Sequence, residues 1–273
     1  MNTIRKLWII SALLLTLFFL HIGFGNTNAA PGLIKFAAVG DVECSDAKNV
    51  ASKIKLVNVN RTLVLGDLGY QAEGGNCIRD AFIGTNAKPT VGNHDDTDKV
   101  RDVWDITHDI QTYKTGNVRF LSLNTEMDAD AQKSRVQGLL NKYKNDSSID
   151  WIIPFEHKPF VTNPSAHHKE SEAKGFRSTF LPMFDANPKV ALVLFGHNHG
   201  YQQCSANGII FITAGTGGRN PYPWGSSMDD GCKYNISGTD GFLVASVTSN
   251  EIVGMFKDLK NNQYDNTKFE ISK

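Results

Sequence analysis

The chain has 273 residues, of which 41% are hydrophobic and 10% aromatic, and its 28 acidic and 28 basic residues give a formal net charge of zero at pH 7. This composition is typical of a globular protein and excludes a disordered or strongly charged polypeptide. The balanced charge gives no reason to expect nucleic acid as a partner.

The first 29 residues have the form of a signal peptide. Arg5 and Lys6 precede an almost wholly apolar stretch, residues 7–20, and residues 27–30 offer small side chains for cleavage. The apolar stretch is short for a membrane span, although an uncleaved anchor stays open as the alternative. Cleavage would leave a single domain, residues 30–273, that is secreted or extracytoplasmic and has no membrane partner unless the anchor is retained.

Apolar strands alternate with amphipathic helices along the chain, and more strands follow. Ser45 can cap the first helix, whose apolar residues recur with helical spacing. The expected strands are 34–39, 62–65, 118–123, 151–155, 190–195, 209–214, 242–247 and 252–256. One helix is expected to begin after Ser45, a second to cover 131–144, and a third to cover 176–184 and to be shortened by Pro182. The last two strands read as a hairpin. This mixture predicts helices flanking two stacked sheets.

Polar clusters follow several of these strands. They are Gly40-Asp41, Gly66-Asp67-Leu68-Gly69-Tyr70, Gly92-Asn93-His94-Asp95, His157 and Gly196-His197-Asn198-His199. Open α/β sheets place their sites at the carboxyl ends of strands. Oxygen and nitrogen donors without thiolate suit hard or borderline metals. Seven such donors are too many for one four-coordinate ion, so the sequence predicts two metals that share a carboxylate, an arrangement suited to displacement at phosphorus.

In this order and spacing the clusters resemble those of the calcineurin-like metallophosphoesterases, and within them the purple acid phosphatase-like branch. The resemblance runs from about residue 36 to 218 and implies a mixed α/β fold, a four-layer αββα sandwich of two mixed β-sheets flanked by helices. Many members carry Asp-x-His in the first block, whereas the purple branch has Asp-x-Gly and recruits a Tyr from the second block. Here the first block reads Asp41-Val42-Glu43 and Tyr70 is present, so Glu43 is the departure that the sequence leaves unexplained.

The resemblance also implies a ligand set. The first metal would be held by Asp41, Asp67, Tyr70 and His199, and the second by Asp67, Asn93, His157 and His197. A phenolate with two carboxylates suits Fe(III), and amide with imidazoles suits Zn, Mn or Fe(II).

The activity implied is that of an acid phosphatase-like phosphomonoesterase acting on small phosphate esters, with a metal-bound hydroxide that attacks phosphorus in line. His94 is the candidate acid for the departing alkoxide, and Asp95 the candidate to orient His94. A phosphodiesterase or nucleotide hydrolase would use the same metals. A non-catalytic metal-binding protein is the third hypothesis.

Two long loops lie between the clusters, residues 161–174 and 215–240. His167, His168 and Arg219 are the candidates there for contacting substrate, with surface solvation as the alternative for each.

Four cysteines, Cys44, Cys77, Cys204 and Cys232, remain in the exported chain. Three pairings are open, and buried free thiols are the alternative. Cys44 and Cys77 follow adjacent parallel strands at the same edge, and Cys204 and Cys232 bracket the loops after the last His cluster. We therefore predict the disulfides 44–77 and 204–232.

Overall fold

The computed structural model describes residues 32–70, 73–162, 171–224, 231–260 and 262–273, and Leu33–Lys273 form one compact unit. The predicted signal peptide lies outside the described residues. Among the residues described, no helix is long and apolar enough to cross a membrane.

One sheet has six strands in the order β13-β12-β11-β1-β2-β3. The three strands β1, β2 and β3 are parallel to one another, and β11, β12 and β13 run antiparallel to their neighbours. The strand bounds are β1 Ile34–Val39, β2 Arg61–Leu65, β3 Ala87–Thr90, β11 Gly241–Val247, β12 Glu251–Asp258 and β13 Phe269–Ser272. The sheet is therefore mixed, as the resemblance implies.

The second sheet has seven strands in the order β10-β8-β9-β7-β6-β5-β4. Its centre is parallel, from β5 through β6 and β7 to β9, and its outer strands are antiparallel. The strand bounds are β4 Gln111–Thr115, β5 Val118–Ser122, β6 Trp151–Glu156, β7 Leu192–Phe195, β8 Tyr201–Ala206, β9 Ile209–Ala214 and β10 Tyr234–Ile236.

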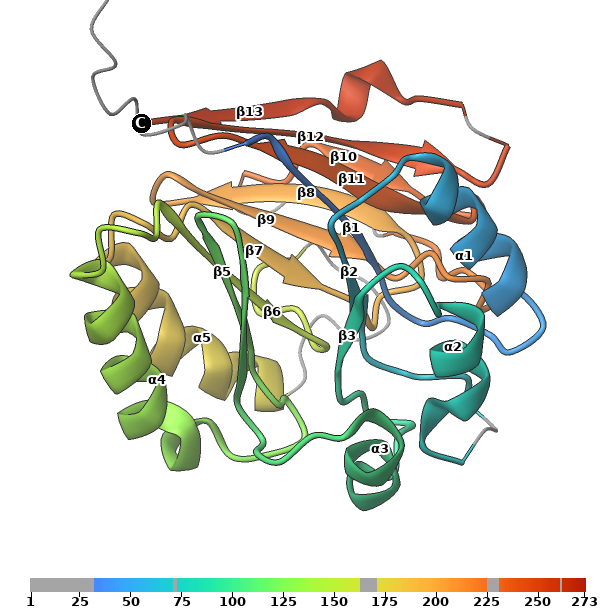
Figure 1. Cartoon of the computed structure of the whole chain (residues 1–273), viewed down its shortest axis with the longest axis horizontal. Helices are drawn as coiled ribbons and strands as arrows, with labels where there is room; N and C mark the ends of the chain where they lie inside the picture. The colour runs from blue at the N-terminus through green and yellow to red at the C-terminus, as the bar shows by residue number, and fades with distance from the viewer. Residues whose placement is uncertain (1–31, 71–72, 163–170, 225–230, 261) are drawn as a thin grey trace, which may run out of the picture. The chain divides into compact units, whose positions relative to one another are not determined.

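Five α-helices cover the outer faces of the two sheets (Figure 1). The helices are α1 Ala47–Leu56, α2 Asn76–Ala81, α3 Thr97–Trp104, α4 Ala129–Lys144 and α5 Ser171–Asp185. One apolar cluster joins the first three to the six-stranded sheet, and another joins α4 and α5 to the seven-stranded sheet. A third fills the space between the sheets, where Phe36 and Phe120 meet edge to face at 5.3 Å. These layers confirm the predicted αββα sandwich.

Every strand expected from the sequence is present, and the hairpin of β11 and β12 is confirmed. Two details of the helices were wrong. Asp46, not Ser45, is the residue before α1. The last helix is not shortened by Pro182, because α5 continues through it to Asp185.

The structure contains both disulfides of the predicted pairing. Cys44 is bonded to Cys77 and Cys204 to Cys232, and the described residues include no free cysteine. The first bond links the loop after β1 to the start of α2, close to the ends of the strands that carry Asp41 and Asp67. It therefore restrains two of the loops that form the candidate site.

Glu156 is a buried carboxyl group with no hydrogen-bond partner among the described residues. Its side chain is fully buried at the end of β6, and neither carboxylate oxygen has a hydrogen bond to the residues described. Burial raises the pKa of Glu156 well above its usual value. The folded protein therefore holds this proton at a pH where the unfolded chain has released it, so the group destabilises the fold increasingly as pH rises above about 4.3.

We expect Glu156→Met to raise the free energy of unfolding of the metal-free protein at pH 7 by about 1–3 kcal/mol, since Met fills a similar space without unsatisfied polar atoms. The gain should be smaller at pH 4, where the carboxyl is neutral in the folded state and mostly neutral in the unfolded state. Urea unfolding at the two pH values measures it, with exposed Glu73→Met as the control. A loss of stability at pH 7 would show that Glu156 has a partner after all.

Candidate metal centre

All seven predicted ligands converge at one edge of the two sheets, where the strands that carry them end. Asp41 follows β1, Asp67 and Tyr70 follow β2, Asn93 follows β3, His157 follows β6, and His197 and His199 follow β7. Five of them are buried, Tyr70 is partly exposed and Asn93 is exposed. Single ligand atoms of Asp41, Asp67 and His157 lie within 4.8 Å of one another.

One set of donors surrounds the phenol oxygen of Tyr70. This oxygen lies 3.0 Å from Oδ1 of Asp41 and 2.9 Å from Nε2 of His199. The same two atoms of Asp41 and His199 are 3.3 Å apart. Three donor atoms at such distances form a triangle that a single cation could occupy.

A second set surrounds Nε2 of His157. This nitrogen lies 3.0 Å from Oδ1 of Asn93, 3.2 Å from Nδ1 of His197 and 3.3 Å from Oδ1 of Asp67. The set combines one carboxylate with one amide and two imidazoles, so it carries less negative charge than the first.

Asp67 reaches both sets. Oδ1 of its carboxylate lies 3.3 Å from Nε2 of His157 in the second set, and one of its oxygens lies within 4.8 Å of a carboxylate oxygen of Asp41 in the first. Burial and the charges of Asp41 and Asp67 all raise the pKa of Tyr70. Asp67 therefore lies between the two groups of donors, and its role as a shared carboxylate stays a prediction.

Two of the imidazoles are oriented by backbone carbonyls. Nδ1 of His157 donates to the carbonyl of Leu65 at 2.7 Å, and Nδ1 of His199 donates to the carbonyl of Asn220 at 2.7 Å. A proton held on Nδ1 leaves Nε2 to face the site, which is how ligand histidines are commonly fixed. The ring of His199 also stacks on Tyr222, with centroids 4.1 Å apart.

Backbone strain is concentrated at this site. Asp41, Asp67, Tyr70 and His197 have positive φ angles between 50° and 68°, and they make up half of the non-glycine residues in the described chain with this conformation. Such a conformation is costly for residues with a Cβ and gathers at functional sites. These turns direct the four side chains toward the candidate site at the carboxyl ends of the strands.

Glycines next to the ligands allow the loops to approach closely. A Cβ on Gly92 would lie 2.3 Å from both the backbone nitrogen and Oδ1 of Asp67. A Cβ on Gly66, whose φ is +82°, would lie 2.5 Å from Nδ1 of His157. The glycine that begins each of these clusters is therefore required by the packing of the next ligand.

The charged groups of the site shift the pKa values of His157 and Asp67. Burial alone would lower the pKa of His157, but the carboxylates of Asp67 and Asp41 raise it to about 10. Burial acts against ionisation of Asp67, but His157 and the backbone N–H of His94 outweigh it and hold the pKa of Asp67 well below its usual value. A metal would have to displace the proton shared by this pair, so its binding should weaken as pH falls.

His94 lies at the entrance of the site. Its side chain is exposed, its ring centroid is 5.0 Å from that of Tyr70, and its backbone nitrogen donates to Oδ1 of Asp67 at 2.9 Å.

Asp95 connects two loops. Its oxygens accept from the backbone nitrogens of Leu68 at 2.7 Å and Gly92 at 2.8 Å. Burial and the charge of Asp67 raise the pKa of Asp95 to about 7. Orientation of His94 by Asp95 stays a prediction.

The predicted substrate contacts divide into two groups. His167 and His168 lie outside the described residues. Arg219 lies beside the site, where it is ion-paired with Glu43 and its guanidinium carbon lies 4.2 Å from the ring centroid of Tyr70.

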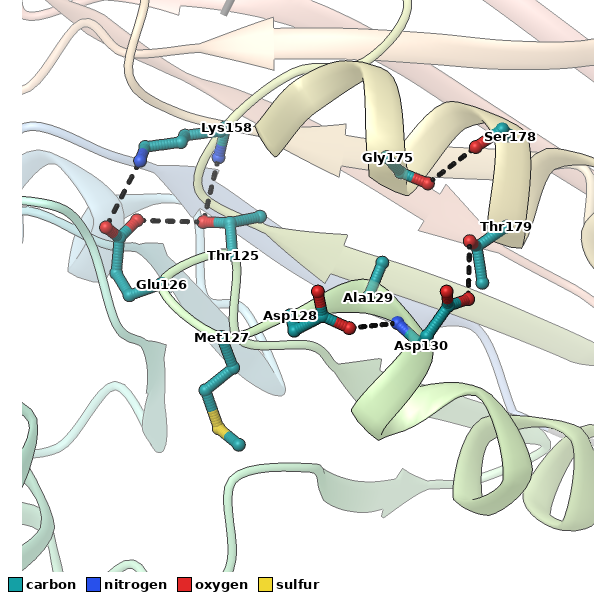
Figure 2. A pocket seen from close by; sticks show the side chains of 10 residues that line it. All are labelled: Thr125, Glu126, Met127, Asp128, Ala129, Asp130, Lys158, Gly175, Ser178 and Thr179. Atoms are coloured by element: carbon teal, nitrogen blue, oxygen red, sulfur yellow. Dashed lines mark hydrogen bonds and ion pairs between the residues drawn. The ribbon is translucent and has the colours of Figure 1, made fainter. Parts of the chain in front are cut away.

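A cavity of about 470 Å³ opens next to the His157 strand end. It lies between the loop after β5, the start of α4, Lys158 and the first half of α5 (Figure 2). Lys158 follows His157 directly, and its Nζ is ion-paired with Oε2 of Glu126 at 3.1 Å. Sequence analysis missed this cavity because the segments that line it carry no motif.

The donors fit a pair of metal ions. Buried carboxylates are costly to desolvate unless a positive charge compensates them. Here two such carboxylates face converging imidazole, amide and phenol groups, and oxygen and nitrogen donors of this kind suit divalent and trivalent cations.

The family of the protein follows from sequence comparison. Residues 34–201 match the family described as calcineurin-like phosphoesterase, so the chain belongs to this family. No curated protein matches the chain significantly.

Several solved structures share the fold. A purple acid phosphatase from yellow lupin (Lupinus luteus) seeds superposes with a TM-score of 0.72 at 15% identity, over 88% of this chain and 54% of that chain. GAP50, described as the anchor in the inner membrane complex of Plasmodium, also has a TM-score of 0.72 at 15% identity, over 88% of this chain and 89% of that chain. This chain thus spans about half the length of the lupin enzyme.

Proposed function

We propose that the protein is a dinuclear-metal phosphoric ester hydrolase, and specifically an acid phosphatase-like phosphomonoesterase. The observation that carries the proposal is the pair of donor sets with Asp67 between them, since two ions sharing a carboxylate suit displacement at phosphorus. When bound, the two ions would bind the oxygens of the ester and lower the pKa of a coordinated water.

The two donor sets support a division of the ligands between two ions. Asp41, Asp67, Tyr70 and His199 would hold the first ion, and Asp67, Asn93, His157 and His197 the second. The anionic first set suits Fe(III), and the more neutral second set suits Zn, Mn or Fe(II).

Other side chains have roles in binding and proton transfer. The imidazole of His94, which is exposed, would give a proton to the departing alkoxide. Arg219 offers a planar cation for the phosphate oxygens. The cavity beside Lys158 offers room for the alcohol part of an ester. The two disulfides support an extracytoplasmic location, where such bonds persist.

A non-catalytic role is the second candidate. It is favoured by the similarity to GAP50, which matches as well as the purple acid phosphatase does and over more of its own length. The complete ligand set and His94 favour the hydrolase, because a binding protein does not need a proton donor at the entrance.

Hydrolysis assays separate these functions. The purified protein, treated with chelator and then reloaded with Fe, Zn or Mn, is offered an aryl monoester, an aryl diester and a nucleotide. We expect monoester hydrolysis that chelation abolishes and divalent metal restores, since the more neutral second set should lose its ion first. Preference for the diester or nucleotide would support the alternative hydrolases. Metal binding without any hydrolysis would support the non-catalytic role, and full activity in a metal-free preparation would reject a metallohydrolase.

Tyr70→Phe tests the first donor set. A phenolate bound to Fe(III) gives a visible charge-transfer absorption, so the iron-loaded protein should be pink or purple. Phe keeps the ring and its contacts with His94 and Arg219 but removes the oxygen, so this variant should lose the band while its far-ultraviolet circular dichroism is unchanged. Absorption spectra of both proteins at matched iron content make the comparison. A colourless wild-type protein with a full complement of Fe(III) would exclude Tyr70 as its ligand.

A further inference from the structure

Three loops of the candidate site are tied together by backbone bridges around Val42. Val42 pairs in parallel with Leu68 and antiparallel with Gly218. The backbone nitrogen of Glu43 donates to the carbonyl of Gly217 at 3.2 Å. The loops after β1, β2 and β9 therefore run side by side at this point, and each carries a polar side chain one or two residues beyond its bridge.

These three side chains are Glu43, Tyr70 and Arg219, and they form a continuous series of contacts. Nη1 of Arg219 is ion-paired with Oε1 of Glu43, and the guanidinium carbon lies 4.2 Å from the ring centroid of Tyr70. The side chains of Glu43 and Arg219 are 22% and 37% exposed, so the pair lies partly sheltered at the rim of the site. Hydrogen bonding to Glu43 is the main reason that the pKa of Arg219 is raised.

The ring of Tyr70 needs such support. It extends from a residue with a φ of +50°, and its phenol oxygen must stay within about 3 Å of both Asp41 and His199. His94 and His199 contact the ring with centroids 5.0 and 6.2 Å away, and Arg219 contacts its face. A guanidinium stacked on an aromatic face has a defined orientation only if its own donors are held, and Glu43 holds them.

We propose that Glu43 is a positioning residue, which holds Arg219 against the face of Tyr70 and thereby fixes the phenol oxygen at the first donor set. This inference rests on the proposed function for its effect on turnover, but the positioning itself is a property of the metal-free protein. It gives a structural role to the residue that stands where the purple branch has a glycine. Glu43 acts through Arg219, so the two residues form one unit.

The test measures the ring of Tyr70 directly. Protein with ¹³C-labelled tyrosine rings is studied by NMR in the metal-free state, and the Tyr70 signal is assigned by its absence from Tyr70→Phe. In Glu43→Ala and Arg219→Ala we expect the Tyr70 signal to shift and broaden, and the double variant should show no larger change than Arg219→Ala alone. Glu73→Ala, which removes the partner of Lys99 in an exposed ion pair, is the matched control and should leave the signal unchanged.

Turnover provides the second measurement. With metals bound, Glu43→Ala should lower kcat about tenfold or more through misplacement of the Tyr70 oxygen, and KM can change as well because Arg219 moves. Glu43→Gln, which keeps the size but not the charge, should recover only part of the loss. An unchanged Tyr70 signal in folded Glu43→Ala, shown by an unaltered circular dichroism spectrum, would overturn the proposal, as would a change confined to KM. If the wild-type protein hydrolyses no ester, the proposed function fails, and the NMR comparison still decides whether Glu43 positions Tyr70.

Discussion

Asp67→Asn is expected to remove both metals and abolish hydrolysis. Asp67 lies close to donors of both sets, and Asn keeps its size while removing the negative charge that the two ions would share. The loss of several kcal/mol of transition-state stabilisation corresponds to a fall in turnover of at least about 10³-fold. Elemental analysis after dialysis should show less than one metal per chain, and steady-state assays of an aryl phosphate measure the loss of rate.

Asp80→Asn is the matched control, because Asp80 is an exposed carboxylate on α2 that pairs only with its neighbour Arg79 in the described contacts. It should retain both metals and full turnover. If Asp67→Asn also retained two metals and turned over at the rate of wild type, Asp67 would not bridge the ions and the ligand assignment would have to be abandoned.

The sequence could predict that the candidate ligands lie together because each is placed by local structure. A buried strand ends, a glycine permits a close turn, and the next residue carries the donor, as in Gly66-Asp67 and Gly92-Asn93. Parallel strands then bring these ends to the same edge without further information. The same logic placed Cys44 near Cys77.

The supporting contacts could not be predicted, because they join segments whose separation in sequence carries no pattern. Glu43 and Arg219 are 176 residues apart, and Asp95 meets the backbone nitrogen of Leu68 across 27 residues. Tertiary packing alone brings each of these pairs together.

The strands that sequence analysis missed are mainly those without a strong apolar pattern. β3 contains Pro89 and lies at an edge of the six-stranded sheet, and the polar β4 lies at an edge of the seven-stranded sheet. Edge strands tolerate proline and polar residues because one side faces no partner strand. Hydrophobic periodicity therefore predicts the central strands of each sheet more reliably than the edge strands.

His94→Ala is expected to lower turnover by about 10²-fold or more for an alkyl phosphate, the range for a lost general acid. The substitution spares the backbone N–H that donates to Asp67, so metal content should stay at the wild-type level. For a nitrophenyl phosphate the loss should be much smaller, because this leaving group departs without a proton. Comparing kcat for the two esters, with exposed His108→Ala as the control, makes the measurement. An equal loss on both esters would mean that His94 positions the substrate and does not supply the proton, since only proton donation depends on the basicity of the leaving group.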